Sequence, residues 1–242
     1  MWIETAVTCY VISLLCYMIT FFLKWKGIPE IIANIFFSIG FGLVTLCLVQ
    51  RAVTGGGAPW LDSYGAFLFL SWTMILIFWI FTRKIHWYPL VICVILLSCL
   101  SLGYAEWFEN SPSPLPVAER SNWWTLHEGF KFLGYGAFAV SSTAGSLSFF
   151  RSPLGDELIL ITHQTMAVGF LLLTAGIIAG IIWFNEEWGT YFGWSAKGCG
   201  ILMTWVLDAL YFHLAMRGKC NIKKGPWIAI AGFTFLILLG VS

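Results

Sequence analysis

The stretch TMAVGFLLLTAGIIAGIIWF, residues 165–184, contains twenty consecutive positions without a charged side chain. A helix of about 20 apolar residues spans the roughly 30 Å hydrocarbon core of a bilayer. Inside lipid, only helices and closed barrels satisfy their own backbone, and a run this long and continuous indicates a helix. Gly176 and Gly180 stand four residues apart, a spacing that lets a second helix approach closely.

Similar apolar runs recur along the whole chain, which is 59% hydrophobic and only 10% charged. Soluble domains carry about 25% charged residues. The sequence therefore predicts an all-α, polytopic integral membrane protein with about eight transmembrane helices. We expect one membrane domain over residues 1–242, with two N-terminal helices in 1–58 and a core in 59–242. The helices are expected at roughly 4–23, 29–49, 64–82, 87–104, 124–150, 157–184, 196–216 and 225–241.

The basic residues predict the orientation of these helices. Nine Lys and Arg fall in one set of alternating connections and four in the other. Both termini and the 185–197 loop are therefore expected outside. Glu4, with no basic residue before the first apolar run, favours a retained helix over a signal peptide.

Several function classes find no support in the sequence. It has no basic patch for nucleic acid, no CxxCH for covalent haem, and no HExxH or phosphate-binding Gly loop. The seven Cys are expected to act as small buried hydrophobes. No hydrolase or transferase site is evident, so an enzymatic role stays open.

The four His all fall at or inside predicted membrane segments, where ionisable side chains are costly and mark candidate sites. His127 opens a helix at the outer side, whereas His86, His163 and His213 lie at inner ends. His163 and His213 are predicted at similar depth, where two imidazoles could clamp a haem iron. His86 is the weakest candidate, because a single interfacial His commonly serves only as an anchor.

An aromatic, Gly-punctuated segment follows the long apolar run. Trp188, Tyr191, Phe192 and Trp194 lie within seven residues of each other, between two membrane helices. Flat side chains concentrated at a membrane surface favour a platform for a large planar ligand. His127 is predicted on the same side, so the two features would face one ligand.

From about residue 59 onward the chain resembles cytochrome c biogenesis proteins of the CcsA/ResC type, which are related to the CcmC haem-handling proteins. The matching stretches, in order, are 59–64 (PWLDSY), 69–72 (FLSW), 126–127 (LH), 134–137 (GYGA), 156–158 (DEL), 169–180 (GFLLLTAGIIAG), 185–198 (NEEWGTYFGWSAKG), 204–205 (TW) and 211–213 (YFH). The 185–198 stretch is similar to the family's tryptophan-rich WWD motif.

The resemblance implies that haem, non-covalent and of b type, binds on the outer face over the tryptophan-rich loop. It makes His127 the first outer axial ligand and His213 the intramembrane ligand. It also implies a membrane partner of the ResB/CcsB kind. The expected location is a bacterial cytoplasmic or thylakoid-type membrane, with the aromatic loop on the extracytoplasmic side.

The motif is divergent in this chain. The family's Asp is Ser195, its Glu is Gly198 and one Trp is Phe192, while a second outer His does not appear before Ser242. Glu128 and Lys131 stand where the family is apolar, and an i, i+3 pair can neutralise itself.

Asp208 sits in the middle of a predicted membrane helix. A carboxylate at this depth needs a hydrogen-bond partner, stays protonated or marks a proton path. Both a structural and a functional interpretation of Asp208 stay open.

Three functions fit these features. The first is haem handling for cytochrome c maturation, with haem presented on the outer face. The second is a haem b subunit of a respiratory complex, which passes electrons between a quinone and a multihaem cytochrome c subunit and uses His163 with His213. The third is a scaffold that keeps the fold without haem, as in HemX-like relatives.

Overall fold

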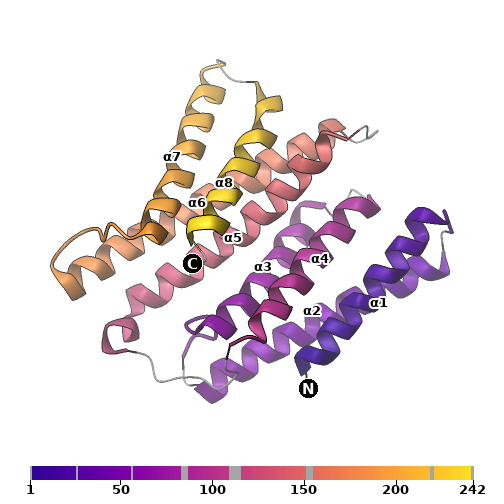
Figure 1. The fold of residues 1–242 in the computed structure, drawn as a ribbon, viewed down its shortest axis with the longest axis horizontal. Coiled ribbons are helices and arrows are strands. Elements are labelled where there is room, and N and C mark those ends of the chain that lie inside the picture. Colours follow the sequence, from indigo (N-terminus) through magenta and orange to yellow (C-terminus); the bar gives the residue numbers. More distant parts are fainter. Residues whose placement is uncertain are drawn as a thin grey trace. The chain divides into compact units, whose positions relative to one another are not determined.

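The computed structural model describes residues 2–25, 27–55, 57–82, 87–108, 116–150, 155–218 and 221–240. These residues form eight α-helices and two short 3₁₀ helices, with no strand among them (Figure 1). The helices are α1 (Trp2–Phe22), α2 (Ile28–Gly55), α3 (Ser63–Thr82), α4 (Tyr88–Ala105), η1 (Val117–Arg120), α5 (Asn122–Ser148), α6 (Gly155–Trp188), α7 (Ala196–Met216), η2 (Ile222–Lys224) and α8 (Gly225–Gly240).

The all-helical, polytopic prediction is confirmed. Six helices are long and apolar enough to cross a membrane, namely α1, α2, α3, α4, α6 and α7. Helix α5 carries Glu128 and Lys131 within its length, and α8 has only 16 residues. Whether α5 and α8 also span, and on which side the termini lie, stay predictions.

The chain forms two compact units, Met1–Leu115 and Pro116–Ser242. In the first unit, α1 packs along α2 and α4, and α3 packs along α4. Helix α2 ends six residues later than expected, and Arg51 near its end donates to Asp62 Oδ2 at 2.5 Å, just before α3. The expectation of a single membrane domain stays a prediction.

The second unit is built on the long pairing of α5 with α6, to which α8 and α7 are added. Glycines allow the two long helices to approach: a Cβ at Gly176 would lie 3.3 Å from Lys131 N and 3.5 Å from His127 O. This confirms the close approach predicted for this part of residues 165–184.

Helix α6 ends later than the sequence predicted. It continues through Asn185, Glu186 and Glu187 to Trp188, so the first four residues of the expected 185–197 loop are helical. Its 34 residues correspond to about 50 Å at 1.5 Å per residue, longer than a bilayer core. The polar last turn therefore extends beyond the apolar span without breaking helical hydrogen bonding.

Candidate functional site

A cavity of about 210 Å³ lies among α5, α6 and α7 in the second unit. His127 lines it from α5, Gly180 and Phe184 from α6, and Tyr191 and Phe192 from the segment before α7. The remaining lining residues are Trp124, Glu128, Lys131, Ile177, Ile181, Trp183, Gly193, Ser195, Lys197, Gly198, Ile201 and Leu202. The structure thus brings together His127 and part of the aromatic segment, which the sequence placed on one side.

The imidazole of His127 is held by the backbone of α6. Its Nδ1 lies 2.8 Å from the carbonyl oxygen of Gly176. A carbonyl can only accept, so Nδ1 carries the hydrogen and Nε2 keeps its lone pair. Nε2 is 3.8 Å from Glu128 Oε1, beyond hydrogen-bonding distance. This is the arrangement that orients a His as a metal ligand through Nε2.

Space for the imidazole depends on Gly180. A Cβ there would lie 2.5 Å from His127 Nδ1 and 2.9 Å from Cε1. Gly176 thus supplies the acceptor for the imidazole and Gly180 supplies the room, one helical turn apart.

Two Trp rings pack in sequence beside the His127 imidazole. The rings of Trp124 and His127 are 5.5 Å apart, and those of Trp124 and Trp183 are 4.3 Å apart. Trp183 is fixed in turn because its Nε1 donates to Ala118 O at 2.7 Å. These side chains make the wall of the cavity largely apolar.

The aromatic segment divides into two parts. Tyr191 and Phe192 line the cavity, whereas Trp188 and Trp194 do not and are 62% and 81% exposed. Gly193 lets the segment approach α6, since a Cβ there would meet Phe184 Cζ at 2.5 Å. Of the four predicted platform residues, two therefore line the cavity and two present their rings outward.

Ser195, which replaces the family's Asp, has a structural role. Its hydroxyl accepts from Gly198 N at 3.1 Å and caps α7. Ser and Asp are both strong N-cap residues, so the exchange keeps the start of the helix. A Cβ at Gly198 would lie 3.1 Å from Gly193 O, which explains why a small residue suits this turn.

Glu128 and Lys131 are buried and form an ion pair with each other beside the cavity. The pairing expected from their i, i+3 spacing is confirmed. In η1, partial burial raises the pKa of the Glu119 carboxyl, as does the charge of Glu128, while Lys131 opposes the shift. The first part of α5 and the adjacent η1 therefore carry a small network of charges.

His163 and His213 lie elsewhere in the second unit. His163 Nδ1 is 3.0 Å from the hydroxyl of Tyr211, and its ring is 5.3 Å from that of Phe212. His213 is exposed on α7. The thirteen residues from His163 to Gly176 correspond to roughly 20 Å along α6, so His163 and His127 belong to different sites. His163 and His213 as joint haem ligands stay a prediction, and His86 lies outside the described residues.

Asp208 is buried in α7, with a side chain only 1% exposed. Neither carboxylate oxygen has a hydrogen-bond partner among the described residues. The structural role considered from the sequence, a hydrogen-bonded carboxylate, thus finds no partner in this part of the chain.

Comparison with known proteins identifies the family. The model of the cytochrome C assembly protein family matches residues 60–241. The chain belongs to this family. Its members include the CcsA proteins of Guillardia theta, 27% identical over 96% of this chain and 91% of the relative, and of Prochlorococcus marinus, 29% identical over 82% and 78%.

A solved structure has the same fold. The cytochrome c haem lyase CcmF matches 99% of this chain with a TM-score of 0.72 and 17% identity, and the chain spans 45% of that protein. Membership of the cytochrome c assembly family, with its apolar helices, makes the chain an integral membrane protein and supports a role in cytochrome c maturation.

Some residues of the site escaped the sequence analysis. In the sequence, Trp183 and Phe184 stand only within an apolar run, and Gly180 predicts close helix packing but no part in a ligand site. The signal was their position on α6: residues 176, 180 and 183 recur at i, i+4 and i+7, so they share the helix face that meets His127.

Proposed function

We propose that this protein binds haem as its cargo at His127 and presents it on the extracytoplasmic face of its membrane during cytochrome c maturation. The observation that carries the proposal is the hydrogen bond from His127 Nδ1 to Gly176 O, which leaves Nε2 as a ligand beside the cavity. Haem iron supplies the Lewis acid that an imidazole nitrogen binds.

The surroundings of His127 suit a porphyrin edge. The cavity, at about 210 Å³, is smaller than the roughly 300–1,000 Å³ of enclosed ligand pockets. The macrocycle would therefore be held partly in the cavity and partly against the segment that carries the exposed Tyr191 and Trp194 rings. Lys197 lines the same cavity and offers an ammonium group to a carboxylate of the ligand.

Among the described residues that line the proposed site, His127 supplies the one imidazole. A second axial ligand would come from a partner, for which we propose a membrane protein of the ResB/CcsB kind or the apocytochrome itself. An open coordination position suits a protein that must release its cargo. We propose a bacterial cytoplasmic or thylakoid-type membrane, with the aromatic segment on the extracytoplasmic side.

Absorbance of the purified protein tests this proposal. We expect a Soret band in wild type that falls by at least about tenfold in His127→Ala, because the iron loses its ligand. Added imidazole should restore the band by entering the space left by the side chain. Glu157→Gln, at an exposed position in the first turn of α6, is the control and should keep the band.

Cytochrome c levels in the host provide the second measurement. Haem-stained c-type cytochromes should fall in the His127→Ala strain and stay normal with Glu157→Gln. A Soret band that survives His127→Ala but disappears with His163→Ala or His213→Ala would overturn the proposal in favour of an inner haem and electron transfer. Absence of the band from wild type, reconstituted with hemin and its partner, would favour the scaffold interpretation.

A further inference from the structure

The first unit contains a larger cavity, of about 400 Å³, that the proposed haem site does not use. It lies at the end of the unit where α1 and α3 end and α2 and α4 begin. By the charge pattern this is the predicted inner side, opposite to the aromatic segment 188–197. Its volume falls within the roughly 300–1,000 Å³ of small-molecule sites.

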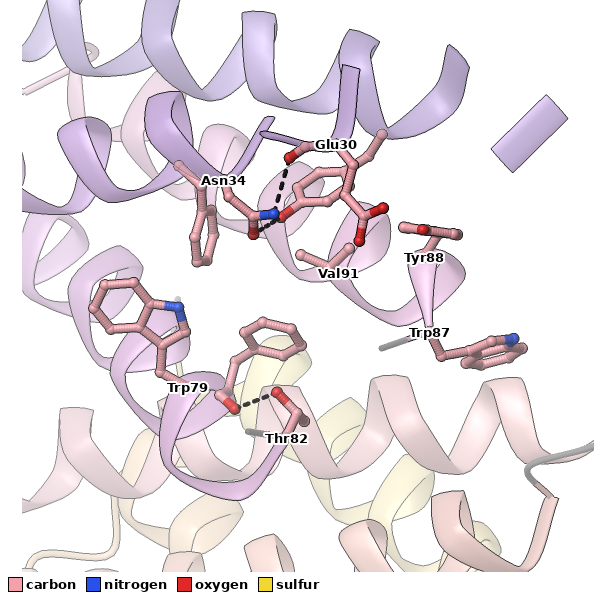
Figure 2. Close-up of a pocket in the computed structure, with 10 residues that line it drawn as sticks. Glu30, Asn34, Trp79, Thr82, Trp87, Tyr88 and Val91 are labelled. Atoms are coloured by element: carbon pink, nitrogen blue, oxygen red, sulfur yellow. Dashed lines mark hydrogen bonds between the residues drawn. The ribbon is translucent and has the colours of Figure 1, made fainter. Parts of the chain in front are cut away.

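The described lining combines aromatic rings with one carboxylate (Figure 2). Six of its ten residues are aromatic, namely Tyr17, Phe37, Phe78, Trp79, Trp87 and Tyr88. Glu30 supplies the carboxylate from the first turn of α2, and its side chain points toward Tyr88. No basic side chain is among the described lining residues.

Hydrogen bonds hold the polar side of the cavity in place. Tyr17 donates its hydroxyl to Asn34 Oδ1 at 2.8 Å, and Asn34 Nδ2 donates to Glu30 O at 2.8 Å. The rings of Tyr17 and Tyr88 lie 6.2 Å apart. The Tyr17–Asn34 bond thus joins α1 to α2, and the ring contact between Tyr17 and Tyr88 places α4 beside them on this side of the cavity.

We propose that this cavity binds an organic ammonium group, as carried by the head group of a zwitterionic phospholipid. Aromatic faces attract organic cations, and aromatic cages are a recurrent way to recognise quaternary ammonium. Glu30 adds a carboxylate, and it makes no ion pair with a cation among the described residues. An anionic ligand would meet that charge without a described basic partner in the lining.

The position of the cavity favours a lipid as the source of the ammonium. Trp79, Trp87 and Tyr88 lie at helix ends, where Trp and Tyr concentrate at the level of lipid head groups. Phe37, Phe78 and Val91 give the cavity an apolar side for the start of an acyl chain. A soluble amine carries the same charge but would leave this side empty.

Native mass spectrometry of the protein with defined lipids tests the proposal. Detergent-purified protein is mixed with equal amounts of phosphatidylethanolamine, phosphatidylcholine and phosphatidylglycerol. The head groups of the first two, called the amine lipids here, carry an ammonium group, whereas that of phosphatidylglycerol does not. We expect the two amine lipids to be retained at least about fivefold over phosphatidylglycerol. Glu30→Gln should reduce that preference to near unity. A loss of about fivefold is the size expected when one desolvated cation–π or charge-assisted contact is removed.

Matched variants separate recognition from folding. Trp87→Leu should weaken retention of the amine lipids, whereas Trp87→Phe, which keeps an aromatic face, should keep most of it. Glu157→Gln removes an exposed carboxylate from the first turn of α6 and should change nothing. Monodisperse elution and an unchanged melting temperature show that each variant is folded.

Competition with tetramethylammonium distinguishes the two sources of the ammonium. Displacement of the lipid at millimolar tetramethylammonium would support the ammonium group alone as the determinant. Retention of a Glu30-dependent lipid preference without displacement would support the lipid as the occupant. A preference for phosphatidylglycerol, or amine-lipid retention unaffected by both Glu30→Gln and Trp87→Leu, would overturn the proposal. None of these readouts depends on haem.

Discussion

Gly180 is the residue on which the position of the His127 imidazole depends most directly. A methyl group at Gly180 would stand 2.5 Å from Nδ1 and displace the ring from its acceptor, Gly176 O. The hydrogen bond that selects the Nδ1-protonated tautomer would then be broken. The site is therefore sensitive to a single carbon atom on the neighbouring helix.

We expect Gly180→Ala to reduce haem retention strongly while the protein still folds. Overpacking of this kind costs about 1–3 kcal/mol, which a protein of this size tolerates. The Soret absorbance measures the effect, and Gly103→Ala, where a Cβ meets nothing within 4 Å, is the control. Equal haem retention in Gly180→Ala and wild type would contradict the tautomer argument.

Glu119 predicts a small dependence of stability on pH. Its pKa is raised in the folded protein, so the folded state binds the proton more tightly than the unfolded chain. Stability therefore falls as pH rises from the unfolded value of 4.5 through the raised pKa. Glu119→Gln should reduce the change of melting temperature with pH over that window. Glu187→Gln, at an exposed site, is the control. A steeper slope in Glu119→Gln would refute the assignment.

The residues themselves identified only part of the site. His127, Tyr191 and Phe192 were predicted from residue type and side of the membrane, and the structure brings them to one cavity. Trp188 and Trp194 carry the same signal but face outward, because helix α6 continues to 188 and Ser195 caps the next helix. Which rings turn inward depends on where helices end, and this is the least certain part of a sequence-based prediction.

At the scale of the element, α5 is the unusual helix. It packs along α6 but buries Glu128 and Lys131, which form an ion pair with each other. Two charges inside an apolar bundle are tolerable only as a pair, since each alone is strongly desolvated. The pair, together with the many Gly, Ser and Thr residues of α5, keeps the mean hydropathy of this helix below that of the six apolar spans. The boundaries of α5 still match the sequence prediction within two residues.

Removing one residue of the Glu128–Lys131 ion pair should therefore destabilise the protein more than removing both. We expect Lys131→Met to destabilise the protein by about 3–5 kcal/mol, because Glu128 is left as a buried, uncompensated charge. The double variant Glu128→Gln/Lys131→Met should recover most of the loss. Melting temperatures in detergent give the comparison, and additive losses in the double variant would show that the two side chains act independently.

At the scale of the whole molecule, hydropathy and charge predicted most of the architecture. The eight expected helices agree with the eight observed in order, and most boundaries agree within two residues. This succeeds because a long uncharged run has few structural alternatives in lipid. The cavity at Glu30 could not be predicted, because its lining comes from four helices and each residue alone resembles an interfacial anchor.

Membrane sidedness is the prediction that belongs to this scale. In a cysteine-free background, Thr190→Cys in the aromatic segment should react with an impermeant maleimide in intact cells. Trp25→Cys, between α1 and α2, should react only after the membrane is opened. The basic residues of alternating connections are the physical reason. The reverse labelling pattern would invert the proposed orientation and place the Glu30 cavity outside.

The acceptor of the His127 hydrogen bond is a main-chain carbonyl, and this bears on how the protein can diverge. A side-chain acceptor would be lost with one substitution, whereas Gly176 O is present whatever side chains its neighbours carry. What must be preserved is the axial register of two helices. Side chains around the cavity can therefore change while the imidazole tautomer stays the same, provided that this register is kept.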